Sequence, residues 1–400
     1  MKKSLLRRVK ELYQAPAVRF ARIYRRRLRH THVVGITGSC GKTSAKDFTA
    51  AVLSERFAGR KSYDTTNNAY SVARTLLATR PSHGFCVQEV GAFRPGAMDP
   101  AIAALQPTIA VMTMIGSDHV KSFRGPEAVA LEKRKLVDAL PADGTAVLNA
   151  DDPRIADIAA QAKVRVLTFG RSESADLRAD HVVGRYPDRL GFDVVYGDER
   201  VHVQTQLLGE HLLTSLLAAI AVGVVAGVPL DMAARALGRV PASEGRMQLV
   251  ETPGGPTFID DSYKASYWSL GAVFEFLRTA RAERTWLVLG TVADHEFRRR
   301  KLYRMLVEQA LGNVDHLVCI GQSAHYAPES DGRVHTFERV QEADEFLHAE
   351  LRRGDLVLVK GSNRADHLAR LVLSHLQPVT CWREACGLSI HCSACRLLAR

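Results

Sequence analysis

The residues from Gly35 to Ser44 have the types and spacing of a loop that binds phosphate. They read Gly-Ile-Thr-Gly-Ser-Cys-Gly-Lys-Thr-Ser, between a short apolar run and a segment with a helical pattern. Gly38 and Gly41 permit a tight turn whose N–H groups can surround phosphate at a helix N-terminus. Lys42 can then reach the outer phosphates of a nucleotide, and the Thr43 hydroxyl can bind Mg2+. The other loop residues expected to contact the nucleotide are Thr37, Ser39, Cys40 and Ser44.

The spacing of this loop differs from the common phosphate-binding pattern, in which glycine is followed by four residues and then Gly-Lys. That pattern requires glycine at position 36, where this chain has Ile36. A glycine turn that binds nothing is the alternative interpretation. The strand pattern before the loop, the Gly-Lys-Thr core and the helical pattern after it favour nucleotide binding.

Four of the seven cysteines lie within the last 20 residues. They are Cys381, Cys386, Cys392 and Cys395. Four thiolates can hold a tetrahedral Zn2+, and a gap of two residues, as in the last pair, is typical of such sites. His391 is a spare ligand candidate. Free or redox-paired thiols and an iron–sulfur centre are the open alternatives. The remaining cysteines are scattered, which indicates a reducing compartment and not a disulfide framework.

An α/β fold must position these residues, because strand and helix patterns alternate along the chain. The expected strands of the first domain cover residues 32–36, 85–89, 109–114, 145–149 and 164–169. The expected helices cover residues 43–55, 72–78, 127–140 and 155–162. This order predicts a mostly parallel sheet with helices on both faces. Residues 180–208 have the pattern of short strands and turns, which predicts an antiparallel extension of the same domain.

A second, smaller α/β unit of Rossmann-like type is expected after a hinge at residues 241–245. Its expected strands cover residues 258–260, 286–289, 316–320 and 356–359. The predicted organisation is a basic leader (1–30), a nucleotide-binding domain (31–244), a C-terminal domain (245–378) and a cysteine-rich tail (379–400).

The positive charge of the chain is concentrated at its N-terminus. Eleven of the first 30 residues are basic and one is acidic, so they account for nearly all of the net charge of +11. The remaining chain lacks the surplus charge of a nucleic-acid binder. Leu5, Leu6, Val9, Leu12 and Tyr13 fall on one side of a helix, so the leader can lie on an anionic membrane surface. A solvated helix packed beside the nucleotide-binding domain and a helix bound to an acidic partner are the alternatives.

Residues 212–230 form an uncharged run that is long enough to cross a membrane. The run is rich in Ala, Val and Gly, contains Thr214 and Ser215, and has no basic flank. A buried helix of the α/β core is therefore the favoured interpretation. Because the leader lacks the apolar stretch of a signal peptide, we expect a cytoplasmic protein that can touch the inner membrane surface.

The phosphate loop and a series of later segments resemble the Mur ligases, a family that joins an amine to a carboxylate with ATP. The similar segments follow one another in the family's order over residues 32–375. They are residues 64–68, 87–92, 94–96, 113–119, 148–152, 209–211, 245–246, 260–263, 288–290, 354–355 and 360–362. One such motif would be weak, whereas so many collinear motifs are specific. Within the family, the chain is most similar to the branch that adds D-alanyl-D-alanine in cell-wall synthesis.

The resemblance implies a site for ATP and Mg2+ in which Lys42, Glu89, His119 and Lys133 are catalytic. It makes Glu89 and His119 magnesium ligands beside Thr43. It also implies that Lys133 carries a carbamate, which turns a cation into a carboxylate-like magnesium ligand. Without the resemblance, Glu89 can be a solvated strand end, His119 a loop histidine with ordinary partners, and Lys133 part of a basic helix face.

The resemblance further implies nucleotide contacts from Asn149, from Arg246 at the hinge and from Asp261 near the ribose. Three positions depart from the family's usual residues in ways that affect the expected adenine contacts. They are Met114, Leu212 and Ser215. Residues 264–267 read Lys-Ala-Ser-Tyr where the family has Asn-Ala-Asn-Pro near the incoming amine. An amine other than D-alanyl-D-alanine is therefore expected.

A last departure concerns the carboxylate substrate. The cell-wall ligases of this branch carry a domain for the UDP-sugar before the phosphate loop, whereas 34 residues precede Gly35 here. We therefore expect an ATP-dependent ligase that forms an amide through an acyl phosphate, on a carboxylate other than the usual UDP-muramyl peptide. A non-catalytic nucleotide-binding or regulatory partner is the alternative. No nucleic-acid partner is expected.

Overall fold

The structure is a computed structural model that describes residues 14–117, 122–328, 330–384, 386–388 and 390–399. The chain divides into two compact units. The N-terminal unit comprises residues 1–182, 191–205 and 212–240, and the C-terminal unit comprises residues 183–190, 206–211 and 241–400. Among the described residues, no helix combines the length and the apolar character needed to cross a membrane.

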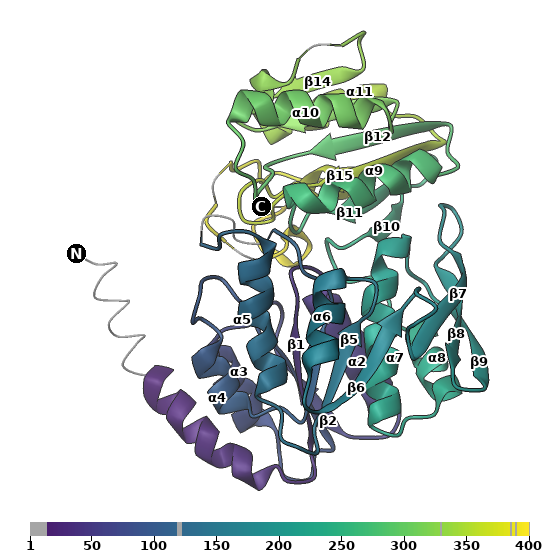
Figure 1. Cartoon of the computed structure of the whole chain (residues 1–400). Helices are drawn as coiled ribbons and strands as arrows, with labels where there is room; N and C mark the ends of the chain where they lie inside the picture. Colours follow the sequence, from purple (N-terminus) through teal and green to yellow (C-terminus); the bar gives the residue numbers. More distant parts are fainter. Residues whose placement is uncertain (1–13, 118–121, 329, 385, 389, 400) are drawn as a thin grey trace. The chain divides into compact units, whose positions relative to one another are not determined.

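The N-terminal unit is built on a sheet of nine strands within the described part of the chain, in the order β2-β3-β1-β4-β5-β6-β7-β8-β9 (Figure 1). The strands are β1 (His32–Thr37), β2 (Gly59–Lys61), β3 (Phe85–Glu89), β4 (Ile109–Met112), β5 (Thr145–Asn149), β6 (Arg165–Gly170), β7 (Leu177–Val183), β8 (Gly191–Tyr196) and β9 (Glu199–Gln204). Strands β1 to β6 pair in parallel, and β8 and β9 form an antiparallel pair. The predicted parallel sheet with an antiparallel extension is confirmed, although β7 still pairs in parallel with β6.

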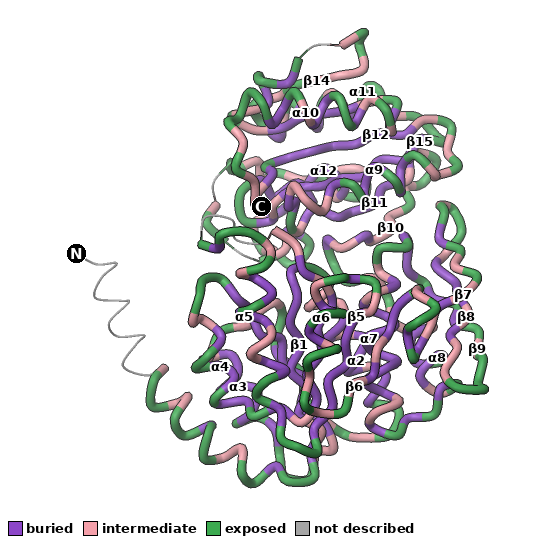
Figure 2. The backbone as a smooth tube through the Cα atoms, viewed as in Figure 1, coloured by how far each residue is buried: buried purple, intermediate pink, exposed green. Residues whose placement is uncertain are grey.

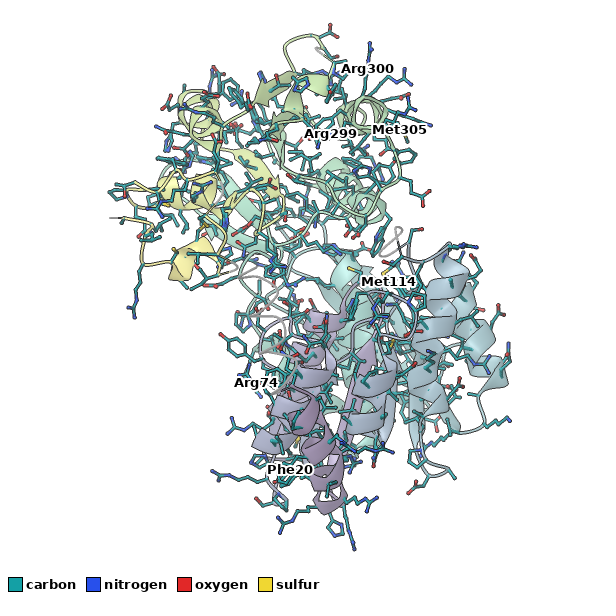
Figure 3. The ribbon with its side chains drawn as sticks, turned by 90° about the vertical axis from the view of Figure 1, so that its left-hand side faces the viewer. Phe20, Arg74, Met114, Arg299, Arg300 and Met305 are labelled. Atoms are coloured by element: carbon teal, nitrogen blue, oxygen red, sulfur yellow. The ribbon has the colours of Figure 1, made fainter. Side chains whose placement is uncertain are left out.

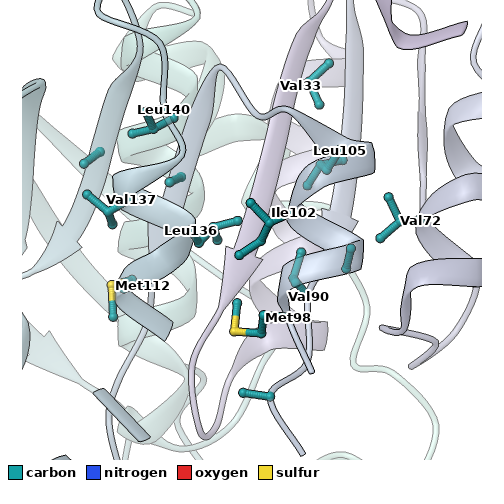
Figure 4. Close-up of a cluster of buried hydrophobic side chains, with 14 of the residues drawn as sticks. Val33, Val72, Val90, Met98, Ile102, Leu105, Met112, Leu136, Val137 and Leu140 are labelled. Atoms are coloured by element: carbon teal, nitrogen blue, oxygen red, sulfur yellow. The ribbon is translucent and has the colours of Figure 1, made fainter. Parts of the chain in front are cut away.

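Helices cover both faces of this sheet (Figure 1). They are α2 (Lys42–Ser54), α3 (Ala69–Ala78), α4 (Asp99–Leu105), α5 (Pro126–Asp138), α6 (Pro153–Gln161), α7 (Leu213–Val225) and α8 (Leu230–Gly238). The side chains of Val33, Met112, Leu105 and Leu136 pack in one core between the sheet and the α3–α6 layer (Figure 4). Because both faces are covered, the central strands are buried throughout, as Figure 2 shows, and their sequences are continuous apolar runs.

Most of the uncharged run at residues 212–230 is helix α7, a buried helix of the core, as predicted. Helix α7 has buried side chains from Leu213 to Gly223 on nearly every position. It packs against α2 and against strands β4, β5 and β6. A helix that is apolar all round needs such enclosure on all sides, and the sheet and the neighbouring helices supply it.

The described part of the leader packs on the N-terminal unit. Residues 14–24 are helical, and Ala21 and Leu28 are fully buried in its core. The Tyr24 hydroxyl donates to the Thr79 carbonyl at 2.9 Å, and Arg25 Nε donates to the Leu105 carbonyl at 2.9 Å. For residues 14–28, these contacts agree with the alternative of a helix packed beside the nucleotide-binding domain. The five apolar residues at positions 5, 6, 9, 12 and 13 lie outside the described residues.

The C-terminal unit contains a six-stranded sheet in the order β10-β11-β15-β12-β13-β14 within the described residues. Its strands are β10 (Gln248–Glu251), β11 (Thr257–Asp261), β12 (Arg284–Leu289), β13 (His316–Ile320), β14 (Val334–Phe337) and β15 (Asp355–Lys360). Its helices are α9 (Leu270–Thr279), α10 (Arg299–Leu311), α11 (Val340–Glu350) and α12 (Ala369–Ser374). Helices α9 and α10 bury one face, and α11 and α12 bury the other. The predicted α/β class of this unit is confirmed, with an antiparallel edge strand, β10.

Candidate active site

Four central strands of the N-terminal unit end at one edge of the sheet, and the polar residues of the site follow them. Ile36 at the end of β1 lies opposite Glu89 at the end of β3. Thr37 pairs with Met112 of β4, which in turn pairs with Leu148 of β5. The carboxyl ends of parallel strands are where α/β proteins bind ligands. The parallel register therefore gathers the phosphate loop and Glu89 at one place.

The phosphate loop adopts backbone angles that require its glycines. Gly38 and Gly41 have φ angles of +154° and +78°, and Gly41 caps helix α2. A Cβ atom on Gly38 would lie 2.0 Å from Thr113 Oγ1, and one on Gly41 would lie 2.7 Å from Ser215 Oγ. The loop is thus held tightly against its neighbours, and the N-terminus of a 13-residue helix opens on it. Such a loop can take a phosphate group on its backbone N–H groups.

Replacing Gly41 with alanine should destabilise the protein by about 1–2 kcal/mol, because alanine is strained at positive φ and its Cβ meets Ser215 Oγ. Thermal unfolding should show a lower Tm than the wild type. Adding Ser215→Ala should recover part of the loss by removing the clash, while the backbone strain remains. Gly271→Ala is the control, since nothing lies within 4 Å of its Cβ and helix α9 favours alanine. Equal Tm values for Gly41→Ala and the wild type would contradict this account of the loop.

Lys42 and Thr37 offer unused polar groups at the loop. Lys42 Nζ donates to the carbonyls of Gly38 at 2.7 Å and Ser39 at 3.4 Å, so it folds back over the loop with no carboxylate partner among the described residues. The Thr37 hydroxyl is fully buried and has no hydrogen-bond partner among the described residues. Buried polar groups are normally satisfied, so an unpaired hydroxyl here indicates that a ligand completes the site. Both features are consistent with binding of a nucleoside triphosphate.

The Glu89 carboxylate lies between two side chains that donate hydrogen bonds to it. Its carboxylate accepts from Thr43 Oγ1 at 2.8 Å and from Asn67 Nδ2 at 3.0 Å, and 2% of the residue is exposed. The alternative of a solvated strand end is therefore wrong. Carboxylate and hydroxyl oxygens side by side are the ligands that Mg2+ prefers, and Asn67 holds the carboxylate in place.

Lys133 extends from helix α5 into the phosphate loop. It is fully buried, and its Nζ donates to the Gly38 carbonyl at 3.1 Å. Its helix neighbours Arg134 and Lys135 are half-exposed and pair with Asp138 and Asp99. The alternative of a solvated basic helix face is thus wrong for Lys133. A buried lysine with this placement brings either a cation or, after carbamylation, an anion within reach of the bound phosphates.

A second layer of residues fixes the loop from behind. Thr113 Oγ1 donates to the Cys40 carbonyl at 2.5 Å, and Asn149 Nδ2 donates to the Thr113 carbonyl at 2.7 Å. Ser39 N donates to the Met114 carbonyl at 2.8 Å. Ser215 Oγ donates to the Gly41 carbonyl at 3.2 Å. Asn149, predicted to contact nucleotide, supports the loop through Thr113 in this structure. Ser215, identified from the sequence as a departure that affects the expected adenine contacts, supports the loop as well.

Comparison with known proteins agrees with this geometry. Residues 36–223 match the Mur ligase middle domain, and residues 245–363 match the Mur ligase glutamate ligase domain. The UDP-N-acetylmuramoyl-tripeptide–D-alanyl-D-alanine ligase of Mycobacterium tuberculosis is 31% identical over 367 residues, which span 83% of this chain and 71% of that protein. The Escherichia coli ligase of the same name is 27% identical over 305 residues, with 75% and 67% covered. A crystal structure of MurF from Acinetobacter baumannii superposes with a TM-score of 0.82 at 25% identity, covering 91% of this chain and 81% of that one.

The chain belongs to the Mur ligase family. The predictions of the family, of its α/β fold and of an ATP-dependent acid–amino-acid ligase are thereby confirmed. The named relatives also bear out the predicted similarity to the D-alanyl-D-alanine-adding branch. Of the predicted site residues in this Mur ligase, Lys42 and Thr43 belong to the phosphate loop, and Glu89 and Lys133 are hydrogen-bonded to it. His119 lies outside the described residues.

Two further predicted nucleotide contacts lie in the C-terminal unit. The Arg246 guanidinium stacks over the Tyr263 ring at 4.4 Å from its centroid. The Asp261 carboxylate, which is 8% exposed as a residue, forms an ion pair with Lys360 Nζ. Both residues are therefore held in fixed positions within their own unit. Their roles toward nucleotide stay predictions.

The segment that departs from the family near the predicted amine site is tied to the loop after β12. Lys264 Nζ lies 2.8 Å from Asp294 Oδ2, and Ser266 Oγ donates to the same oxygen at 2.8 Å. The Tyr267 backbone N–H donates to the Ala293 carbonyl at 2.9 Å. Among these residues, the Lys264 side chain is half-exposed. The substitutions in this segment are visible in the sequence, whereas the Asp294 carboxylate that binds them lies about 30 residues further on and carries no local signal.

Proposed function

We propose that this Mur ligase uses ATP to activate a carboxylate other than a UDP-muramyl peptide as an acyl phosphate and joins it to an amine other than D-alanyl-D-alanine. Lys42 and Thr43 in the phosphate loop, with the buried side chains of Glu89 and Lys133 beside them, support the ligase reaction. The single observation that supports a different amine is the ion pair of Lys264 with Asp294. It places a lysine, paired with a carboxylate, where the family is expected to carry an asparagine.

The reaction assigns a task to each residue of the site. The carboxylate oxygen attacks the γ-phosphorus of ATP, ADP leaves, and the amine then displaces phosphate from the acyl phosphate. Lys42 stabilises the charge that develops on the transferring phosphoryl group. Mg2+, held by Thr43, Glu89, His119 and the carbamate on Lys133, would neutralise charge on the phosphate oxygens. Asn149, Arg246 and Asp261 are the further proposed nucleotide contacts.

An assay of ADP release with a panel of carboxylates and amines tests the proposal. The panel includes UDP-N-acetylmuramoyl-tripeptide with D-alanyl-D-alanine, and mass spectrometry identifies any amide formed. We expect amine-dependent ADP release with another pair of substrates. Turnover of the muramoyl pair alone would contradict the substrate assignment and leave the ligase reaction intact. Nucleotide binding without stimulation by any amine would favour a non-catalytic regulatory partner.

We also propose that the enzyme is cytoplasmic and that its basic leader contacts the inner membrane surface. Phe20 and Ile23 are 60% and 63% exposed on the helix at residues 14–24, where Figure 3 shows Phe20, and Arg19 and Arg22 are exposed beside them. Exposed apolar side chains beside arginines favour an anionic lipid surface.

Replacing Phe20 and Ile23 together with serine should weaken the binding constant for phosphatidylglycerol vesicles, measured by cosedimentation, by a factor of at least about thirty, since each side chain contributes roughly 1–2 kcal/mol on burial. Vesicles of phosphatidylcholine should bind neither protein. Equal sedimentation of wild type and variant would contradict lipid binding by this helix. Retention by an acidic protein instead would favour the partner alternative.

A further inference from the structure

The four cysteines of the C-terminal tail surround one small cavity in the C-terminal unit. The cavity has a volume of about 20 Å³, which is room for one water-sized particle. Its lining includes Cys381, Cys386, Cys392 and Cys395 together with His367 and Arg370. All four cysteines are free thiols. The tail thus brings together residues that are up to 14 positions apart, and it places them against a loop and a helix of the preceding domain.

The last pair of cysteines has the local conformation of a metal-binding turn. Residues Cys392–Ala394 form a short 3-10 helix, and the Cys395 N–H donates to the Cys392 carbonyl at 3.0 Å. The two cysteines, separated by two residues as in zinc knuckles, both line the cavity. The Thr380 N–H donates to the Leu398 carbonyl at 2.9 Å, which brings the two ends of the tail together.

Arg370 places a buried positive charge beside the thiols. One per cent of the residue is exposed, and its guanidinium donates only to backbone carbonyls among the described residues. Those carbonyls belong to Asp366, His367, Cys381 and Arg383. A buried cation is costly without a negative partner. Three of the thiols, Cys381, Cys386 and Cys392, are among the groups whose negative charge would stabilise it.

The thiols supply that negative charge when a metal ion binds them, and they line the same cavity as Arg370. Coordination to a divalent metal deprotonates a thiol outright. Four thiolates and one Zn2+ carry a net charge of −2, which the guanidinium of Arg370 partly offsets. The buried arginine is therefore accounted for by a metal–thiolate centre.

His367 lies close enough to the thiols to hydrogen-bond with their sulfur atoms without itself being a metal ligand. It is 2% exposed, has a φ of +54°, and places Nε2 3.1 Å from Cys386 Sγ and Nδ1 3.7 Å from Cys392 Sγ. A non-glycine residue at positive φ is strained, and such strain is kept at functional sites. His391 instead lies with Nδ1 2.8 Å from Ser393 Oγ and Nε2 3.4 Å from Asp260 Oδ2. His391, the predicted spare ligand, is therefore excluded from the set.

We propose that Cys381, Cys386, Cys392 and Cys395 bind one structural Zn2+ as four thiolates, with His367 and Arg370 forming the outer layer. Among the described residues, no three of the sulfur atoms lie within 4.8 Å of one another. Tetrahedral binding at about 2.3 Å requires sulfur atoms roughly 3.8 Å apart, so the ion draws the tail inward. Because Ser393 also donates to Glu244 at 2.9 Å, the same ion would anchor the tail on residue 244.

Metal analysis of the full-length protein, purified under reducing conditions with zinc in the medium, tests the proposal. We expect about one zinc ion per chain, and a loss of most of it in Cys392→Ser and in Cys395→Ser. Cys40→Ser and His391→Gln are the matched controls, because Cys40 is exposed in the other unit and His391 faces Asp260. Cobalt in place of zinc should give a sulfur-to-metal charge-transfer band that the two tail variants lack.

A second group of residues offers nitrogen and oxygen ligands for zinc, so the experiment must distinguish this site from the thiol site. Ligand atoms of Asp344, His348 and His375 lie within 4.8 Å of one another. Zinc that is lost from His348→Ala and kept by both cysteine variants would overturn the proposal. Disulfides in a non-reduced peptide map without bound metal, or iron with visible absorption, would overturn it as well.

Removing the metal from the folded wild-type protein tests the structural role without any substitution that could itself damage the fold. Chelation should speed tryptic cleavage after Arg383 and Arg396, both exposed in the tail, by on the order of tenfold. Zinc added back should restore the protection. Identical cleavage rates with and without bound zinc would show that the tail does not depend on the ion and would overturn the structural role.

Discussion

Replacing Lys42 with methionine should lower the rate of ADP release in the ligation assay by about a thousandfold. Lys42 begins helix α2 and holds its ammonium over the phosphate loop by donating to the Gly38 and Ser39 carbonyls. When phosphate enters, the ammonium can exchange these weak partners for the transferring phosphoryl group. Methionine keeps much of the side chain's length and removes the charge, so the loop should persist while the transition state loses its stabilisation.

The design separates catalysis from nucleotide binding. We expect kcat to fall by more than the affinity for ATP, because charge on the phosphoryl group grows in the transition state. Lys61→Met is the matched control, since Lys61 is half-exposed on edge strand β2 and pairs with Asp47. Activity of Lys42→Met within tenfold of the wild type would contradict the assignment of Lys42 to phosphoryl transfer.

The central sheet and its site could be predicted because local pattern and burial coincide there. Strands β1, β3, β4 and β5 are covered on both faces, so each is an apolar run that ends abruptly in polar residues. The polar residues that follow such runs meet at one edge by the geometry of parallel sheets. This is why Glu89 and the phosphate loop could be placed together without a structure.

The elements that sequence reasoning missed lie where pattern and burial diverge. Strand β2 reads Gly-Arg-Lys and is mostly exposed at the sheet edge, so it carries no apolar signal. Edge strands β10 and β14 are likewise only partly buried. Strand β4 ends at Met112, two residues before its expected end, because Thr113 and Met114 turn to support the phosphate loop.

The supporting contacts of the site depend on tertiary structure that no local pattern encodes. Ser215 donates to the Gly41 carbonyl although 174 residues separate them. In sequence alone, Ser215 is only a departure from the family's asparagine, with no sign that its hydroxyl supports the loop. His367 and Arg370 meet the tail cysteines in the same way, since nothing in their own sequence surroundings indicates a buried cation beside thiols.

Replacing Lys133 with alanine should also lower the rate of ligation by a factor of about a thousand. Short carboxylic acids should restore part of this rate. Lys133 is fully buried with its Nζ 3.1 Å from the Gly38 carbonyl. As a carbamate, formed from the amine and CO2 with release of a proton, it would turn an anion toward the metal site. In the alanine variant a molecule such as butyrate can occupy the vacated space and present its carboxylate in the same place.

The rescue distinguishes a missing charge from a damaged fold. Lys133→Met fills the space and should respond to no acid, while both variants should keep a Tm near that of Leu131→Met, an exposed-site control on the same helix. Wild-type activity should fall when CO2 is removed and return with bicarbonate. If Lys133→Ala is inactive but neither acids nor bicarbonate have an effect, Lys133 acts as an ammonium that holds the Gly38 carbonyl, and magnesium must then be bound without it.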